Sequence, residues 1–356
     1  MYFITSQTGR RENNVIPHNV IDFSHSDKRA LHEVVDSEFY TMGKAVSFFE
    51  EACAQYFDRP HALAVSSGSM ALRLALIASG VKYGDNVIVP AYSCSAICNT
   101  VLSLGANVLP CEIEANTCNI DASHAASLAN THDVDVVIAV NTFGIPANIS
   151  ELRANGLIVI EDCSHGFAIN DNNSPAIRGD IAIQSFYATK LFGAAEMGVL
   201  LLNDEEVYEQ LKARRVGYSE EPDGFCLNIK PDEFNAALAL SKINVANELL
   251  KSRKRLASRY LCNNYLATHC VGKLGNRVWY RYVVAVNNAD ELILSLGSQV
   301  EMVKPVTNWV NDLSIYPNAQ LAFNKNVSIP LYPSLSSASQ DVVINLMQKQ
   351  FDRGMC

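Results

Sequence analysis

The sequence has no long apolar run, no paired-cysteine motif and no excess of positive charge. Its longest apolar stretch, at 71–81, is interrupted by Arg73 and Ser79, whereas a transmembrane helix needs roughly 20 apolar residues. None of the ten cysteines forms a C-x-x-C pair, which argues against a zinc or redox motif. We therefore expect no membrane span, no metal site, and cysteines that stay reduced in the cytoplasm.

The deficit of positive charge also narrows the range of partners. With 28 Lys and Arg against 37 Asp and Glu, the formal net charge is -9, so nucleic acid and anionic membranes would repel the chain at long range. The first 14 residues contain no apolar stretch of the kind that marks a secretory signal. The sequence thus favours a cytoplasmic globular protein that binds neither nucleic acid nor membrane.

What the sequence does have is an alternation of short apolar runs and helix-like segments over its first two thirds. The predicted strands lie at 61–67, 86–91, 107–113, 133–141, 157–162, 182–186 and 197–204. Several of these runs lack polar alternation, which is typical of strands covered by helices on both faces. The pattern predicts an α/β fold with a mostly parallel seven-stranded sheet flanked by helices.

The last third has a different pattern. Residues 232–261 contain no Gly or Pro and are apolar at steps of three and four, which predicts one long helix. We expect a large cofactor-binding domain at 1–245, whose first residues, about 15 of them, form an arm, and a smaller α+β domain at 246–356. In the smaller domain, 278–286 predicts a strand.

The turn after the first predicted strand has the composition of an anion-binding site. Gly68 and Ser69 stand between that strand and a helical run, where free amides and the helix dipole favour an anion and glycine allows its close approach. Such turns also cap helices in the absence of a ligand. The turn alone leaves both interpretations open.

The strand at 157–162 ends in two acidic residues. Ligands bind beyond the carboxyl ends of parallel strands, so Asp162 is placed for function. A carboxylate held against a pyridine nitrogen is the arrangement used by pyridoxal phosphate enzymes. A helix cap or a magnesium ligand would also fit this acid.

Lys190 lies between two predicted strands, shortly after Ser185. Most lysines face solvent, but this one has apolar neighbours, including Leu191 and Phe192. Desolvation makes an amine more nucleophilic. The position therefore predicts an amine that reacts with an aldehyde.

Taken in order, these motifs resemble those of the DegT/DnrJ/EryC1/StrS family of fold-type I pyridoxal phosphate enzymes, best known as sugar aminotransferases. The family carries a S-G-[ST]-x-A-L turn, here 67–72, an E-D strand end followed by small residues and His or Gln, here 161–165, and S-F-x-x-x-K, here 185–190. The resemblance covers nearly the whole chain. It implies that pyridoxal 5'-phosphate forms a Schiff base with Lys190.

The resemblance also implies a set of site residues. The cofactor-binding positions would be Gly68, Ser69, Cys94, Asp162, Ser164, His165, Ser185, Lys190 and Asn228, with Lys190, Asp162 and His165 catalytic. Ser164 would lie against one ring face, and His165 would approach the ring hydroxyl unless it is a satisfied polar side chain in the core. Asn228 would reach the phosphate of the neighbouring subunit, which implies a homodimer with shared active sites.

The sequence departs from the family's pattern at several positions. The usual P-x-x-T-[FWY] segment is Pro-Ala-Tyr-Ser-Cys, so that either Cys94 or Tyr92 covers the exposed ring face. The usual E-G-G is Glu-Met-Gly at 196–198, and the usual arginine after the shared asparagine is Lys230, which lacks bidentate geometry. Residues 300–309 replace the common H-Y-P neighbourhood, which leaves the substrate weakly specified.

The activity that the resemblance implies is a ping-pong transamination. The donor would be glutamate or glutamine and the acceptor a keto sugar linked to a nucleotide. A cyclitol or other non-nucleotide ketone as acceptor, and a non-catalytic regulatory member of the fold, stay as alternatives. A pyridoxamine-dependent dehydratase is disfavoured by Lys190, because the family's dehydratases carry histidine there.

Overall fold

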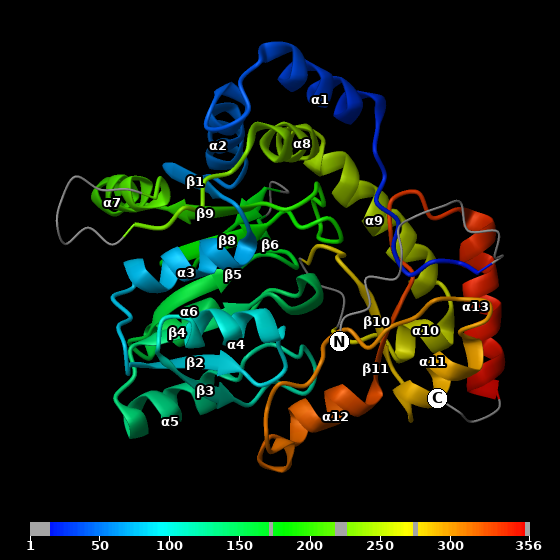
Figure 1. Ribbon diagram of the computed structural model, residues 1–356. Coiled ribbons are helices and arrows are strands. Elements are labelled where there is room, and N and C mark those ends of the chain that lie inside the picture. The colour runs from blue at the N-terminus through cyan, green and yellow to red at the C-terminus, as the bar shows by residue number, and fades with distance from the viewer. Residues whose placement is uncertain (1–14, 171–173, 218–225, 273–276, 353–356) are drawn as a thin grey trace.

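The computed structural model describes residues 15–170, 174–217, 226–272 and 277–352. The expected N-terminal arm therefore lies almost wholly outside the described residues. Figure 1 shows a central sheet with helices on both faces and a second group of helices beyond the carboxyl ends of its strands.

Seven strands form the central sheet in the order β1-β9-β8-β5-β4-β2-β3. They are β1 (His61–Val65), β2 (Asn86–Pro90), β3 (Asn107–Cys111), β4 (Val136–Val140), β5 (Ile158–Asp162), β8 (Ile181–Ser185) and β9 (Gly198–Leu202). Only β9 runs antiparallel to its neighbours, β1 and β8. The predicted mostly parallel seven-stranded α/β sheet is confirmed.

Helices cover both faces of this sheet, as the unbroken apolar strands require. One face packs against α3 (Gly68–Ala78), α4 (Ser95–Leu102) and α7 (Glu205–Arg215). The other face packs against α2 (Lys44–Tyr56) and α8 (Glu233–Asn244) at one side, and against α5 (Ala122–His132) and α6 (Ile149–Ala154) at the other. The helix α1 (His25–Ser37) packs on α8.

The remaining elements lie beyond the carboxyl ends of β2 and β5 in Figure 1. The larger ones are α9 (Ala246–Leu261), α10 (Asn264–Thr268), β10 (Tyr282–Ala285), α11 (Ala289–Leu296), α12 (Pro317–Lys325), β11 (Asn326–Ile329) and α13 (Ser337–Asp352). The strands β10 and β11 pair antiparallel. The short hairpin of β6 (Ala168–Ile169) and β7 (Pro175–Ala176) and the two 3-10 turns, η1 (Thr142–Gly144) and η2 (Leu313–Ile315), complete the described elements.

The segment 232–261 is two helices, so the prediction of one long helix is wrong. Val245 ends α8 and precedes α9, with backbone angles of φ -113° and ψ 16°. Asn244 and Val245 are both weak helix formers, and α8 packs on α1 and α2 whereas α9 contacts α10. The expected domain boundary at 245 falls at this break. The division stays a prediction, because Tyr280 packs in the same core cluster as α2 and α8.

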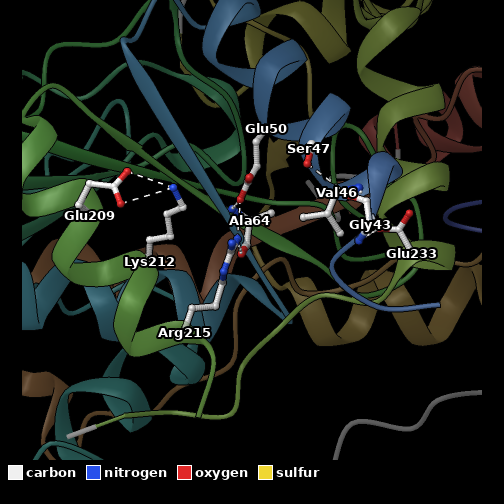
Figure 2. Close-up of polar contacts among 9 residues, drawn as sticks. All are labelled: Gly43, Val46, Ser47, Glu50, Ala64, Glu209, Lys212, Arg215 and Glu233. Carbon is white, nitrogen blue, oxygen red and sulfur yellow. Dashed lines mark hydrogen bonds and ion pairs between the residues drawn. The ribbon is translucent and has the colours of Figure 1, made fainter. Parts of the chain in front are cut away.

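Charged side chains form hydrogen bonds with the outer edge of the edge strand β1 (Figure 2). The backbone N–H of Ala64 donates to Glu50 Oε1 at 2.8 Å, and the carbonyl of Ala64 accepts from Arg215 Nη1 at 2.9 Å. Glu50 and Arg215 also form an ion pair. Their contacts fix the strand that leads into the Gly68 turn.

A buried carboxylate, that of Glu233, holds α2 against α8 in the same region (Figure 2). Glu233 accepts hydrogen bonds from the backbone N–H groups of Gly43, Ala45 and Val46 at 2.8–3.1 Å. Because the N-cap Gly43 has no side chain to cap the helix, Glu233 supplies the acceptors that α2 needs. Among the described residues, no helix is long and apolar enough to cross a bilayer.

Candidate active site

A cavity of about 250 Å³ lies at the carboxyl ends of the parallel strands. Of the predicted site residues, its lining includes Gly68, Ser69, Cys94, Asp162, Ser164, His165, Ser185 and Lys190. Residues from 68 to 190 thus meet at the edge where α/β proteins bind ligands. Asn228 is absent from the lining.

The Gly68 turn presents free donors to this cavity. The N-cap Ser67 accepts from the N–H of Met70 at 3.2 Å, while the described residues offer no acceptor to the N–H groups of Gly68 and Ser69. A Cβ on residue 68 would come within 2.7 Å of the Ser185 Cβ, so only glycine fits there. The start of α3 and Ser185 together form a cradle for an anion.

Ser185 and Ser164 are linked through the backbone of β8. The N–H of Ser185 donates to Ser164 Oγ at 3.2 Å, and Ser185 Oγ accepts from the N–H of Tyr187 at 3.2 Å. Both hydroxyl oxygens therefore act as acceptors within the protein and keep their O–H groups available as donors. Both side chains line the cavity.

Asp162 is a buried carboxylate with few partners. It is 6% exposed, and one of its oxygens accepts from the N–H of Ser164 at 2.9 Å. The described residues provide it with neither a cation nor a second donor. Buried carboxylates are normally paired or fully hydrogen-bonded. Asp162 therefore has room for a cationic N–H group of a ligand.

Lys190 reaches the same cavity from the loop between β8 and β9. Its neighbours Leu191 and Phe192 are buried in the core, but Lys190 itself is partly exposed. Its Nζ lies 5.7 Å from the centre of the Tyr280 ring. The flanking apolar residues, on which the sequence argument relied, thus anchor the loop while the amine faces the cavity.

His165 packs between aromatic rings. Its imidazole stacks on Tyr280 with a centroid distance of 4.5 Å, and its Nδ1 lies 3.5 Å from the N–H of Phe143, which donates to it. Burial and the charges of Lys190 and Arg281 hold the pKa of His165 well below its usual range. The side chain is therefore a neutral imidazole in the cavity wall.

The two candidates for the exposed ring face occupy different environments. Tyr92 is fully buried, and its ring packs edge-on against Phe323 at 4.7 Å. Cys94 is the N-cap of α4 and is partly exposed. Both line the cavity, but Tyr92 is fixed in the core, which leaves Cys94 as the more accessible side chain.

The structure also shows where the other two departures from the family pattern, Met197 and Lys230, lie. Met197 is buried in the core and does not face the cavity. Lys230 Nζ donates to the amide oxygen of Asn228 at 2.7 Å and to the carbonyl of Val216 at 2.9 Å. Lys230 therefore orients Asn228, although that residue lies away from the cavity of its own chain.

Sequence reasoning missed several residues of the cavity and its surroundings. Thr142, Tyr187 and Val306 line the cavity, and Tyr280 contacts two of its residues. Val306 comes from the unmatched segment 300–309, which shows that this segment does reach the site. Tyr280 carried no local signal because its contacts arise from the way distant segments cross.

The cavity fits pyridoxal phosphate. It offers an anion cradle at one side, a carboxylate that lacks a cation, and a lysine amine. Proteins with this sheet and these groups at its carboxyl edge form a class of pyridoxal phosphate-dependent transferases. Within that class, the chain belongs to the DegT/DnrJ/EryC1/StrS aminotransferase family, whose sequence profile matches residues 22–348. The protein is therefore a pyridoxal phosphate-dependent aminotransferase of the family that acts on sugars.

Individual proteins are similar to this chain over most of its length. The chain is 27% identical to the spore coat polysaccharide biosynthesis protein SpsC of Bacillus subtilis, over 95% of this chain and 98% of the relative. It is 26% identical to the GDP-perosamine synthase of Caulobacter vibrioides, over 85% and 89%. Its fold matches the GDP-4-keto-6-deoxy-D-mannose-3-dehydratase of E. coli, with bound hydrated pyridoxal phosphate, at a TM-score of 0.82, with 20% identity over 93% and 98% of the two chains.

Proposed function

We propose that this enzyme moves an amino group from an amino acid, glutamate or glutamine, to a keto sugar linked to a nucleotide. One observation carries the proposal: the Lys190 amine and the incompletely paired Asp162 carboxylate line the same cavity. The nucleotide link is supported by the relative named GDP-perosamine synthase. A location in the cytoplasm is favoured by the free thiols of the nine described cysteines.

The proposed roles follow from where each side chain lies. The N–H groups of Gly68 and Ser69 and the hydroxyl of Ser185 would bind the cofactor phosphate. The Asp162 carboxylate would accept the ring N–H, with Ser164 and Cys94 beside the ring. When bound, the cofactor supplies an aldehyde that exchanges amines and a ring that withdraws electrons from the substrate carbon.

Lys190 would transfer protons during the reaction, and His165 would contact the cofactor ring. The Nζ of Lys190 would anchor the cofactor and, when released, move a proton to and from the substrate carbon. The neutral imidazole of His165 would contact the ring hydroxyl. Since the same amine serves both half-reactions, kinetics of the ping-pong type are expected.

Borohydride reduction tests the role of Lys190. Reduction of the yellow wild-type protein should fix the cofactor on the peptide that contains Lys190, as seen by mass spectrometry. Lys190→Ala should lose the adduct, whereas Lys212→Ala, which changes a solvent-exposed lysine of α7, should keep it. A colourless protein, or an adduct on another lysine, would reject the assignment.

The donor and acceptor are tested by half-reactions. Glutamate or glutamine should convert the cofactor to its aminated form, and keto sugars with and without a nucleotide should then be compared as acceptors. Turnover of a free ketone or cyclitol in preference to the nucleotide-linked sugar would replace the proposed acceptor. No turnover with any acceptor, in a protein that binds the cofactor, would favour a regulatory role.

A homodimer with shared sites is proposed from the place of Asn228. Its side chain is oriented by Lys230 but does not line the cavity of its own chain. Mixed dimers of Lys190→Ala and Asn228→Ala subunits should contain one site with both residues intact, and should regain activity that neither parent has. If the mixture stays as inactive as its parents, Asn228 does not act across subunits.

A further inference from the structure

Tyr280 stands beside two of the proposed site residues, although the sequence indicated only a strand there. The tyrosine ring stacks on His165, with centroids 4.5 Å apart and an interplanar angle of 23°. The Nζ of Lys190 lies 5.7 Å from the centre of the same ring, within the range of a cation–π contact. Tyr280 is 4% exposed, so one buried ring contacts both groups.

The backbone that carries Tyr280 is tightly held. At residue 166, which has φ +150°, a Cβ would come within 2.1 Å of Val278 Cγ2. The chain just before Tyr280 therefore passes directly over the loop that carries His165. On the other side, Arg253 Nη1 donates to the carbonyl of Tyr280 at 3.0 Å. These contacts leave the ring little freedom to move.

The hydroxyl of Tyr280 lies beside the guanidinium group of Arg281. Arg281 Nη2 donates to the Tyr280 oxygen at 3.4 Å, and the buried Arg281 Nη1 has no hydrogen-bond partner among the described residues. Two more cations lie beside other atoms of Tyr280, since the Nζ of Lys190 lies over the ring and Arg253 contacts the backbone carbonyl. Such surroundings favour the anionic form of a phenol.

We propose that Tyr280 is a positioning residue of the active site, whose ring holds Lys190 and His165 in place and whose hydroxyl sets the charge around them. This inference depends on the proposed roles of those two residues. The positive charge of Arg281, and its hydrogen bond to the hydroxyl oxygen, favour loss of the phenolic proton. In the anionic form, the phenolate offsets part of the positive charge that Arg281 places beside it.

The pKa of Tyr280 is shifted in the direction that this geometry predicts. Burial alone would raise the pKa of Tyr280, but the charges of Arg281, Lys190 and Arg253 and the hydrogen bond from Arg281 lower it to about 8. The group that faces the ring from the loop after β5 is His165, which stays neutral because its own pKa is well below its usual range. Arg253 keeps its charge, since burial lowers its pKa only to about 10.

Titration of tyrosine absorbance tests the charge without any measurement of activity. The wild-type protein should show one tyrosine that ionises near pH 8, and Tyr280→Phe should lose that step. Arg281→Gln should move the step upward by about 1–3 units, the effect of removing an adjacent opposite charge. Tyr332→Phe is the control: burial and Asp22 raise the pKa of Tyr332 to about 12, so the step near pH 8 should remain.

Two substitutions separate the ring from the hydroxyl. Tyr280→Phe should keep KM within about twofold and remove the limb near pH 8 from the pH profile of kcat, whereas Tyr280→Leu should also slow borohydride fixation at Lys190 by roughly tenfold. Circular dichroism checks that both variants are folded. The proposal is overturned if the wild-type protein has no tyrosine step below about pH 9, or if both variants match the wild type. Loss of transamination in every protein, with the titration step intact, would instead reject the proposed function.

Discussion

Two neighbouring carboxylates at the end of β5 meet very different surroundings. Glu161 accepts from Asn141 Nδ2 and from the backbone N–H groups of Arg178 and Gly179, each at 2.8 Å. Asp162 points to the opposite face of the sheet and, among the described residues, accepts from one N–H only. Since buried polar groups are normally saturated within the protein, the deficit at Asp162 indicates a ligand, whereas Glu161 holds the fold together.

The same contrast separates the cavity from the region around α2. There, Glu50 and Glu233 are both supplied with several donors. Substitutions in that region should therefore act on the free energy of unfolding. Substitutions in the cavity should act on catalysis, with little change in stability.

The largest effect is expected for Asp162→Asn. The amide keeps the shape of the side chain but loses the negative charge that would stabilise a protonated cofactor ring. We expect kcat/KM to fall on the order of 10²–10³, with a midpoint of thermal unfolding close to that of the wild type. A variant that loses stability but keeps its activity would show that Asp162 stabilises the fold, as Glu161 does, and does not act in catalysis.

Glu50→Ala should be the most destabilising of the structural changes. Arg215 is 3% exposed and Glu50 15% exposed, so the substitution leaves a buried guanidinium without its carboxylate. We expect the free energy of unfolding to fall by about 3 kcal/mol, measured by denaturant titration. Lys212→Ala is the matched control, because its exposed pair with Glu209 should contribute about 0–1 kcal/mol.

Glu161→Gln should lower stability less, since the amide oxygen can still accept. The NH₂ group of the new glutamine would replace one carboxylate oxygen, so that two donors would face each other. The donor that now bonds to that oxygen would lose its acceptor, at a cost of about 1–3 kcal/mol. Activity of the folded fraction should stay within about tenfold of the wild type. A loss of activity as large as that of Asp162→Asn would remove the distinction between the two carboxylates.

The central sheet and the main residues of the cavity could be predicted from the sequence. The seven apolar runs and the motifs around Gly68, Asp162 and Lys190 are local signals, and strand ends place such residues at one edge of the sheet. The break at Val245 was missed because no Gly or Pro marks it. Tyr280 was missed because its contacts depend on a crossing between segments more than 80 residues apart in the chain.

The smallest expected effect is the pH dependence of stability. Burial and the charges of Arg281 and Arg253 hold the pKa of His18 well below its usual range. As the pH falls below about 6.5, the unfolded chain takes up this proton before the folded chain does, so stability decreases by up to about 1.4 kcal/mol per pH unit. His18→Gln should reduce the slope of the stability profile between about pH 6.5 and 5, and the remaining slope should include the contribution of His165.

The control for this prediction is His32→Gln, because His32 is exposed on α1. This substitution should leave the slope of the profile unchanged. Equal slopes in the wild type and in His18→Gln would show that the imidazole of His18 does not contribute to acid sensitivity.

The occupied edge of β1 limits how copies of the chain can associate. Unpaired edge strands invite further strands, from a second copy or from an aggregating chain. At Ala64, within β1, both the N–H and the carbonyl are already used by Glu50 and Arg215. A continuous sheet across two subunits at this edge is therefore disfavoured, and Glu50→Ala should promote aggregation through β1 as well as weaken the fold.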